Sequence, residues 1–146
     1  SYWQIVQSKD YVVILQEMMH DARIIPLTDM PHAPEAIELL HGDSRGYWDG
    51  DTLVVETRNY SDRSELSHNR AELNVERITR IGDGQMRYQL TSNDPSTYSA
   101  PYTREIIFDY SDGDIYEFAC HEGNYALPNM LQGAREEERR AAAGEN

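Results

Sequence analysis

The sequence predicts an all-β domain, an antiparallel meander closing into a lipocalin-like β-barrel, with one short helix near the mouth and a second helix at the C-terminus. Three Asp-Gly pairs, at 49–50, 83–84 and 112–113, each lie between runs rich in Tyr, Val, Ile and Thr. Such pairs are the strongest short-range signal for a tight hairpin. The gaps between runs leave no room for a crossover helix, which excludes a parallel α/β sheet. Closure into a barrel would remove exposed strand edges.

The elements follow from this pattern in chain order. Strands are expected over residues 2–8, 11–19, 22–27, 45–48, 51–59, 73–81, 85–92, 103–110 and 114–121. Pro34 suits the start of a short helix within residues 32–42, and Pro128 suits the start of the C-terminal helix. We expect a single domain over 1–146, with a helical or frayed tail from about residue 134 onward because Gly133 weakens the helix and its face is charged.

Composition narrows the classes of partner. Acidic residues outnumber basic ones 26 to 13, a formal charge of -13 that disfavours nucleic acid. The run YVVIL is far shorter than the roughly 20 residues of a membrane-spanning helix, so no membrane insertion is expected. Cys120 is the single cysteine, so no intrachain disulfide can form. Because the chain opens on SYWQIVQ, we expect a mature, processed protein or a trimmed one.

The second predicted strand is apolar on both faces. Val13, Leu15 and Glu17 share one face, while Ile14 and His20 share the other. A strand of this kind is covered on both sides, by the domain interior on one and by a helix, loop or second subunit on the other. We therefore expect either Glu17 or His20 in a poorly solvated place, and a possible homodimer.

The last predicted strand carries the main candidates for catalysis. Glu117 and His121 share a face, and a carboxylate beside an imidazole in a low-dielectric cavity forms a general acid/base pair. His121 would be the acid or base, with Glu117 or Glu17 as its partner. His20, beside Asp21 at a strand bend, is a further candidate. The residues expected to hold a substrate are Tyr88, Arg77, Asn124, Tyr125, Glu56 and Trp48.

A structural interpretation competes with this catalytic one. Carboxylates on barrel strands, such as Glu56 and Glu76, also pair with arginine in structural networks, and Arg23 and Arg77 are among the available partners. The five histidines show no His-x-His or H-E-x-x-H spacing, so local spacing predicts no zinc site. No organic cofactor is expected, and a metal ion would need ligands gathered from distant strands.

Three stretches, GDSRGYWDGDTLVVET (42–57), EMMHDARIIPL (17–27) and YEFACHEGNY (116–125), carry a resemblance. They resemble blocks that occur in the same order in a group of uncharacterised bacterial proteins, usually exported. The resemblance implies an exported bacterial origin and a further N-terminal segment, and it implies no activity.

Two classes of function fit these observations. One is a small-molecule enzyme that uses acid/base chemistry, of hydrolase, lyase or isomerase type, in the barrel cavity. The other is a non-catalytic binding module for an apolar or aromatic small molecule, or a structural homodimerising domain. A binder should keep its affinity when His121 is replaced, whereas an enzyme should lose turnover.

Overall fold

A computed structural model of the chain describes residues 1–19, 21–61, 72–119 and 121–144. It divides into two compact units, Ser1–Tyr116 and Glu117–Asn146, the first mostly β and the second helical. The strands are β1 Trp3–Gln7, β2 Tyr11–Gln16, β3 Asp21–Pro26, β4 Asp43–Asp49, β5 Thr52–Arg58, β6 Leu73–Gly82, β7 Gln85–Asn93 and β8 Tyr102–Asp109. The predicted β-rich, antiparallel character is therefore confirmed.

The strands form two antiparallel sheets, each in chain order. One sheet is β1-β2-β3 and the other is β4-β5-β6-β7-β8. Two of the predicted Asp-Gly hairpins are present, with Gly50 at φ +59° and Gly84 at φ +75°, values that glycine adopts without steric cost. Between the sheets, the described residues show a single isolated bridge, from Leu27 to Gly46. No closed barrel is found within the described part of the chain.

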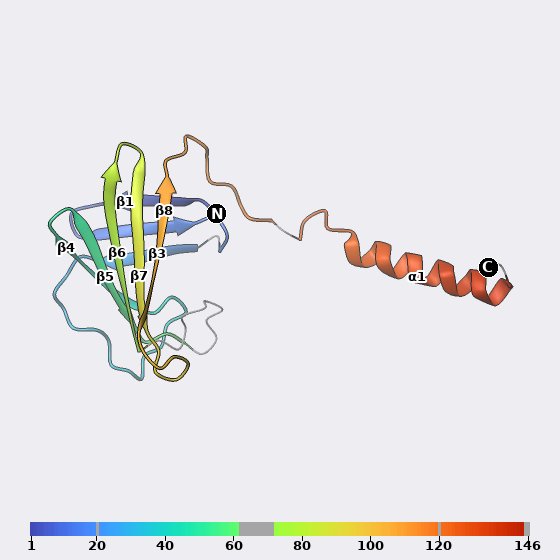
Figure 1. The fold of residues 1–146 in the computed structure, drawn as a ribbon, viewed down its shortest axis with the longest axis horizontal. Coiled ribbons are helices and arrows are strands. Elements are labelled where there is room, and N and C mark those ends of the chain that lie inside the picture. Colours follow the sequence, from blue (N-terminus) through green and yellow to red (C-terminus); the bar gives the residue numbers. More distant parts are fainter. Residues whose placement is uncertain (20, 62–71, 120, 145–146) are drawn as a thin grey trace. The chain divides into compact units, whose positions relative to one another are not determined.

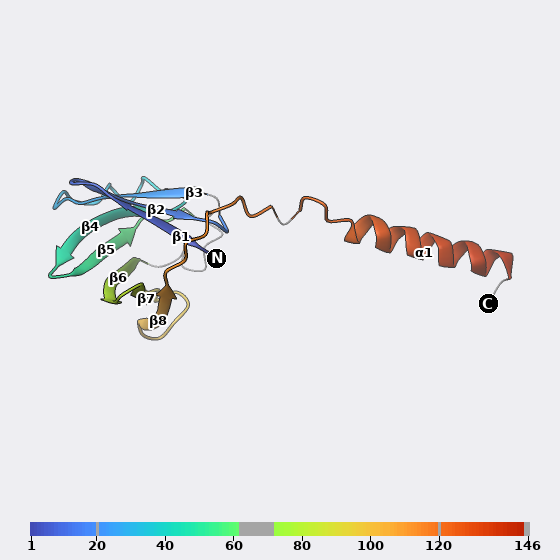
Figure 2. The same cartoon turned by 90° about the horizontal axis from the view of Figure 1, so that it is seen from above.

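The two sheets pack face to face around one apolar core. β1–β3 run across β6–β8 in Figure 1, and Figure 2 shows β1–β3 and β6–β8 as separate layers. This is the orthogonal mode of sheet packing. Trp3 packs against the rings of Tyr88 and Phe108, with centroid distances of 5.2 and 4.8 Å. The buried residues of the core are Val12, Ile14, Ile25, Leu53, Val55, Ile78, Tyr88 and Leu90.

The prediction of a short helix within residues 32–42 is wrong. The segment contains two separate turns, closed by the bonds from Ile37 N to Pro34 O at 2.8 Å and from Gly42 N to Leu39 O at 3.0 Å. Two further backbone donors bond to distant groups: Ala33 N reaches a carboxylate oxygen of Asp43 at 2.8 Å, and Leu39 N reaches Asn59 O at 3.0 Å. These long-range bonds use the N–H groups that an α-helix would need for its own i→i−4 ladder.

The prediction of a strand over 114–121 is also wrong for its described residues, 114–119 and 121. They join no ladder, and the third Asp-Gly pair forms no hairpin. The printed backbone bonds of this stretch are local, such as Ala119 N to Glu117 O at 3.0 Å. A strand is stable only when its backbone groups pair with a neighbour.

The second unit contains the predicted C-terminal helix, α1, over Ala126–Ala143. Gly144, at φ +72°, ends it in the left-handed conformation typical of helix C-caps. Arg140 Nε bonds Glu136 Oε1 at 3.0 Å, one turn apart. None of the helix residues is buried. No described helix is both long and apolar enough to cross a membrane.

Candidate functional site

Strand register lines up a row of small polar residues inside the first unit. Ser44 faces Thr57, Thr57 faces Asn74, and Asn74 faces Ser92, across β4 to β7. All four are buried. Alternation then places apolar rows further along the same inner face, so that face has a polar end and an apolar end.

Arg23, from β3 of the other sheet, reaches into this polar end. Its Nη1 donates to Glu76 Oε1 at 3.0 Å, and its Nη2 also contacts the same carboxylate. Nη2 donates to Thr57 Oγ1 at 2.8 Å, and Nε donates to Ser44 Oγ at 3.1 Å. Every nitrogen of the guanidinium group thus has a partner. Such full satisfaction is what a buried charged group requires.

Tyr88 completes the network from β7, where its hydroxyl donates to Glu76 Oε1 at 2.8 Å. Burial and the nearby Glu76 charge raise the pKa of Tyr88, so the phenol stays protonated and remains a donor. Burial works to lower the pKa of Arg23, but the charge and hydrogen bonds of Glu76 raise it above its usual value. The network is therefore a charged, internally paired link between the sheets.

One atom beside this network lacks a partner among the described residues. Asn74 donates its Nδ2 to the Tyr60 hydroxyl at 3.1 Å, while its Oδ1 is buried without a hydrogen bond there. Burial raises the pKa of Tyr60. The neutral phenol and the amide thus extend the polar row beyond Thr57.

Two histidine–aspartate contacts fix the connection between β3 and β4. His41 Nε2 lies 2.7 Å from Asp21 Oδ2, and His32 Nδ1 lies 3.1 Å from Asp43 Oδ2. The hydrogen bond from His41 lowers the pKa of Asp21. Burial would raise the pKa of Asp43, but bonds from Ala33 N, Arg45 and His32 outweigh it and lower the pKa.

Among the described residues, the predicted Glu117–His121 pair shows no hydrogen bond or ion pair. Glu117 and His121 are both exposed in the second unit, and no ladder puts them on one strand face. Glu17 accepts the backbone N–H of Tyr2 at 3.0 Å. His20 lies outside the described residues, as does Cys120.

The predicted substrate-binding residues are scattered over three environments. Tyr88 is buried in the network described above. Arg77 and Glu56 lie on the outer face of the five-stranded sheet, where Arg77 pairs with Asp49 at 2.8 Å. In the second unit, Asn124 Oδ1 accepts Ala126 N at 3.1 Å and Tyr125 is exposed. Trp48 is exposed at the end of β4 and lines a groove.

That groove opens where the hairpin turns of the first unit gather. Gln7, Trp48 and Arg80 line it from β1, β4 and β6. The groove encloses about 520 Å³, and its other lining residues are Gly50, Asp51 and Gly82.

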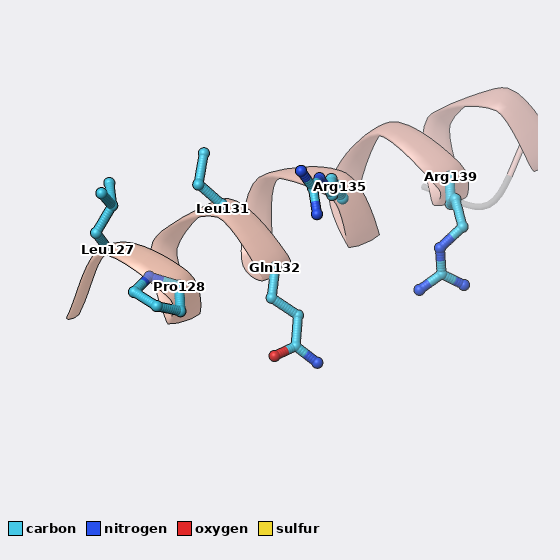
Figure 3. Close-up of a pocket in the computed structure, with 6 residues that line it drawn as sticks. All are labelled: Leu127, Pro128, Leu131, Gln132, Arg135 and Arg139. Atoms are coloured by element: carbon cyan, nitrogen blue, oxygen red, sulfur yellow. The ribbon is translucent and has the colours of Figure 1, made fainter. Parts of the chain in front are cut away.

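A second hollow lies on α1 and is lined by residues of that helix alone. Figure 3 shows the lining side chains projecting from this one helix. They are Leu127, Pro128, Leu131, Gln132, Arg135 and Arg139. A hollow of this shape holds no small molecule on its own.

The outer face of β1–β3 is apolar and open to solvent. Register places Val6, Val13 and Ile24 in one row across the three strands. The side chains of Val6 and Ile24 are 54% and 61% exposed, and Tyr11 at one end of the face is 48% exposed. A contiguous apolar face of this kind marks an interaction surface.

Comparison with known proteins adds no relative: no family model, curated protein or solved structure matches the chain. Within the described ranges, no three His, Cys, Asp or Glu side chains gather closely enough to hold a metal ion.

The sequence predicts the buried network only in part. Arg23, Glu76 and Tyr88 were each candidates, but their meeting depends on the packing of two sheets. The Asp21–His41 pair was missed because the two residues are 20 positions apart, whereas His20 is adjacent to Asp21 in the sequence.

Proposed function

We propose that this domain is a non-catalytic assembly domain that pairs with a second copy of itself through the outer face of β1–β3. The observation that carries the proposal is the row of Val6, Val13 and Ile24, which is apolar across the whole sheet, with Val6 and Ile24 exposed and Val13 half-buried. Removing such surface from water is favourable by about 25 cal/mol per Å². The inner face of the same sheet is already buried, so the outer face is the part left to cover.

The placement of charge around the face gives a second copy a defined orientation. The face has no charged side chain between its ends, whereas the net charge of -13 on the whole chain opposes the approach of two copies and limits their affinity. Lys9, the only lysine, lies at the β1–β2 turn, while Glu17 and Asp21 lie at the opposite end of the strands. Two copies packed with their strands antiparallel, about a two-fold axis along the Val6–Val13–Ile24 row, would bring Lys9 of each toward the acidic end of the other.

The area of the apolar face determines how tightly two copies are expected to bind. Three strands spaced about 4.8 Å apart and roughly 20 Å long offer a face of about 300 Å². Standard stable interfaces bury about 800 Å² per partner. The dimer should therefore dissociate on dilution and be populated only at high protein concentration.

Sedimentation equilibrium of the full chain over a range of concentrations tests the proposal. Ile24→Glu should raise the dissociation constant at least about 100-fold, because each copy would bury an uncompensated carboxylate. Ile107→Glu is the matched control, since Ile107 is 43% exposed on the outer face of the other sheet. A wild type that stays monomeric, or a dimer indifferent to Ile24→Glu, would remove the proposal.

An acid/base enzyme is the second candidate, and the Asp21–His41 pair is the observation that favours it. The two groups lie 2.7 Å apart, with side chains 58% and 27% exposed, so solutes can reach them. A carboxylate that orients an imidazole is a common base in hydrolysis. Hydrolysis of p-nitrophenyl acetate should fall in His41→Gln and persist in His32→Gln. Equal rates in both variants would reject this candidate.

A further inference from the structure

The groove at the hairpin end of the first unit is built from the inner faces of both sheets. Gln7 pairs with the buried Val12, so it has inner-face parity on β1. Trp48 pairs with the buried Leu53, and Arg80 follows Glu76 and Ile78 at alternate positions of β6. These three side chains are therefore the solvent-exposed ends of rows that are buried further in. The groove is the place where the interior of the domain opens to water.

Its composition combines an aromatic ring with polar groups of both signs. Trp48 is 47% exposed, which leaves part of its indole accessible. Asp51 supplies an acceptor, Arg80 supplies donors, and the amide of Gln7 supplies both. At Gly50 a β-carbon would meet nothing within 4 Å, so open space lies beside this lining residue.

We propose that this groove binds a neutral carbohydrate, with a sugar ring stacked on the indole of Trp48. A pyranose presents an apolar C–H face and a rim of hydroxyls that both donate and accept hydrogen bonds. An amphipathic indole flanked by a carboxylate, a guanidinium and an amide matches both features. The groove volume of about 520 Å³ lies within the range of roughly 300–1,000 Å³ usual for small-ligand sites.

Charge argues against the ionic alternatives. An anionic ligand would meet Asp51 and a chain of net charge -13, and a cationic ligand would meet Arg80 on the same rim. Asp51 and Arg80 together leave the lining without net charge. A neutral, hydroxyl-rich ligand carries no such penalty and can use both groups.

Saturation-transfer NMR of the full chain with cellotriose, maltotriose and N,N′-diacetylchitobiose tests the inference. This readout follows the sugar protons and does not depend on tryptophan fluorescence. At least one of the three should give a saturable signal. Trp48→Ala should weaken that sugar at least about 10-fold, since stacking on one aromatic face contributes about this much.

Tyr47→Ala is the matched control. Tyr47 is 49% exposed and adjacent in sequence, but it faces the opposite side of β4. Binding that survives Trp48→Ala, binding lost equally in Tyr47→Ala, or no signal from all three sugars would each overturn the inference. The inference is independent of self-association: Ile24→Glu should leave sugar binding unchanged.

Discussion

The outer faces of the two sheets differ sharply in chemistry. On β4–β8, cross-strand polar pairs cover the surface: Thr91 and Thr103 hydroxyls lie 2.8 Å apart, and Gln89 Nε2 donates to Glu105 Oε2 at 2.9 Å. On β1–β3, the corresponding positions are Val6, Val13 and Ile24. The outer face of β4–β8 thus carries several hydrogen-bonded polar pairs, whereas the central row of the outer face of β1–β3 is apolar.

The contrast between the two outer faces indicates that the outer face of β4–β8 is suited to contact with water. An antiparallel sheet with one solvated face reads as apolar/polar alternation, and β7 follows this pattern, with Tyr88 and Leu90 buried between Arg87, Gln89 and Thr91. β2 does not follow it, because Val12 and Ile14 are buried inside while Val13 and Leu15 point out. Both sheets have the same need to fill the core with their inner faces. The apolar outer face of β1–β3 is therefore unexplained by folding alone and is the part that assembly would use.

The largest loss of stability is expected where the inner faces of the two sheets meet, because the contacts of its inner face hold β1–β3 against the other sheet. Arg23→Ala would leave Glu76 buried without its cation, and breaking a buried pair in this way costs about 3–5 kcal/mol. Urea unfolding followed by circular dichroism measures the loss.

A double replacement separates pairing from packing. Arg23→Met with Glu76→Leu removes both charges and keeps apolar volume, so it should recover most of the stability that Arg23→Ala loses. Surface substitutions ordinarily change the free energy of unfolding by no more than about 0.5 kcal/mol. If Arg23→Ala alone stays within that range of the wild type, the network does not hold the sheets together.

The sequence predicted the hairpins well where strand partners existed. Asp49-Gly50 and Asp83-Gly84 form the turns expected, because β-rich runs of similar length flank both. Asp112-Gly113 carries the same dipeptide and forms none. A turn signal is local, whereas a hairpin also needs a second strand that gains from pairing. Because residues 114–119 have no such partner, Glu117 is exposed and does not lie on a strand face.

The candidate site was predictable only as a list of residue types. Arg23 and Glu76 are 53 positions apart, and their contact depends on how one sheet is laid on the other. Sequence alternation can assign a side chain to a face, yet it cannot say which residue of the opposing sheet it will meet. The apolar outer face was different, since the pattern of β2 alone predicted it.

The second-largest loss of stability is expected at Asp43, in the first strand after the connection between the two sheets. It makes the free energy of unfolding depend on pH. The folded-state pKa of Asp43 is lowered by its bonds to Ala33 N, Arg45 and His32, against the effect of burial. Its stabilisation is therefore complete above the unfolded value of about 3.9 and is lost as the pH falls through the lower folded value.

Asp43→Asn should remove roughly 1.5–3 kcal/mol at neutral pH, as expected for hydrogen bonds to a charged group, and should flatten the loss of stability at acid pH. Urea titrations at a series of pH values compare the variant with the wild type. Asp10→Asn is a control, since Asp10 is an exposed residue of the β1–β2 turn. Parallel acid limbs for Asp43→Asn and wild type would show that Asp43 does not couple the sheets to pH.

The smallest effect tests how two copies would be oriented on the apolar face. Lys9→Glu places like charges at both ends of the strands, so it should weaken the dimer by no more than about 10-fold, the scale of exposed ion pairs. Glu17→Lys alone should weaken it similarly. The two changes together restore opposite charges at the two ends and should return the dissociation constant toward the wild-type value, which sedimentation equilibrium at low salt would detect. Additive losses in the double variant would exclude the antiparallel arrangement, because only that arrangement brings Lys9 to the acidic end of its partner.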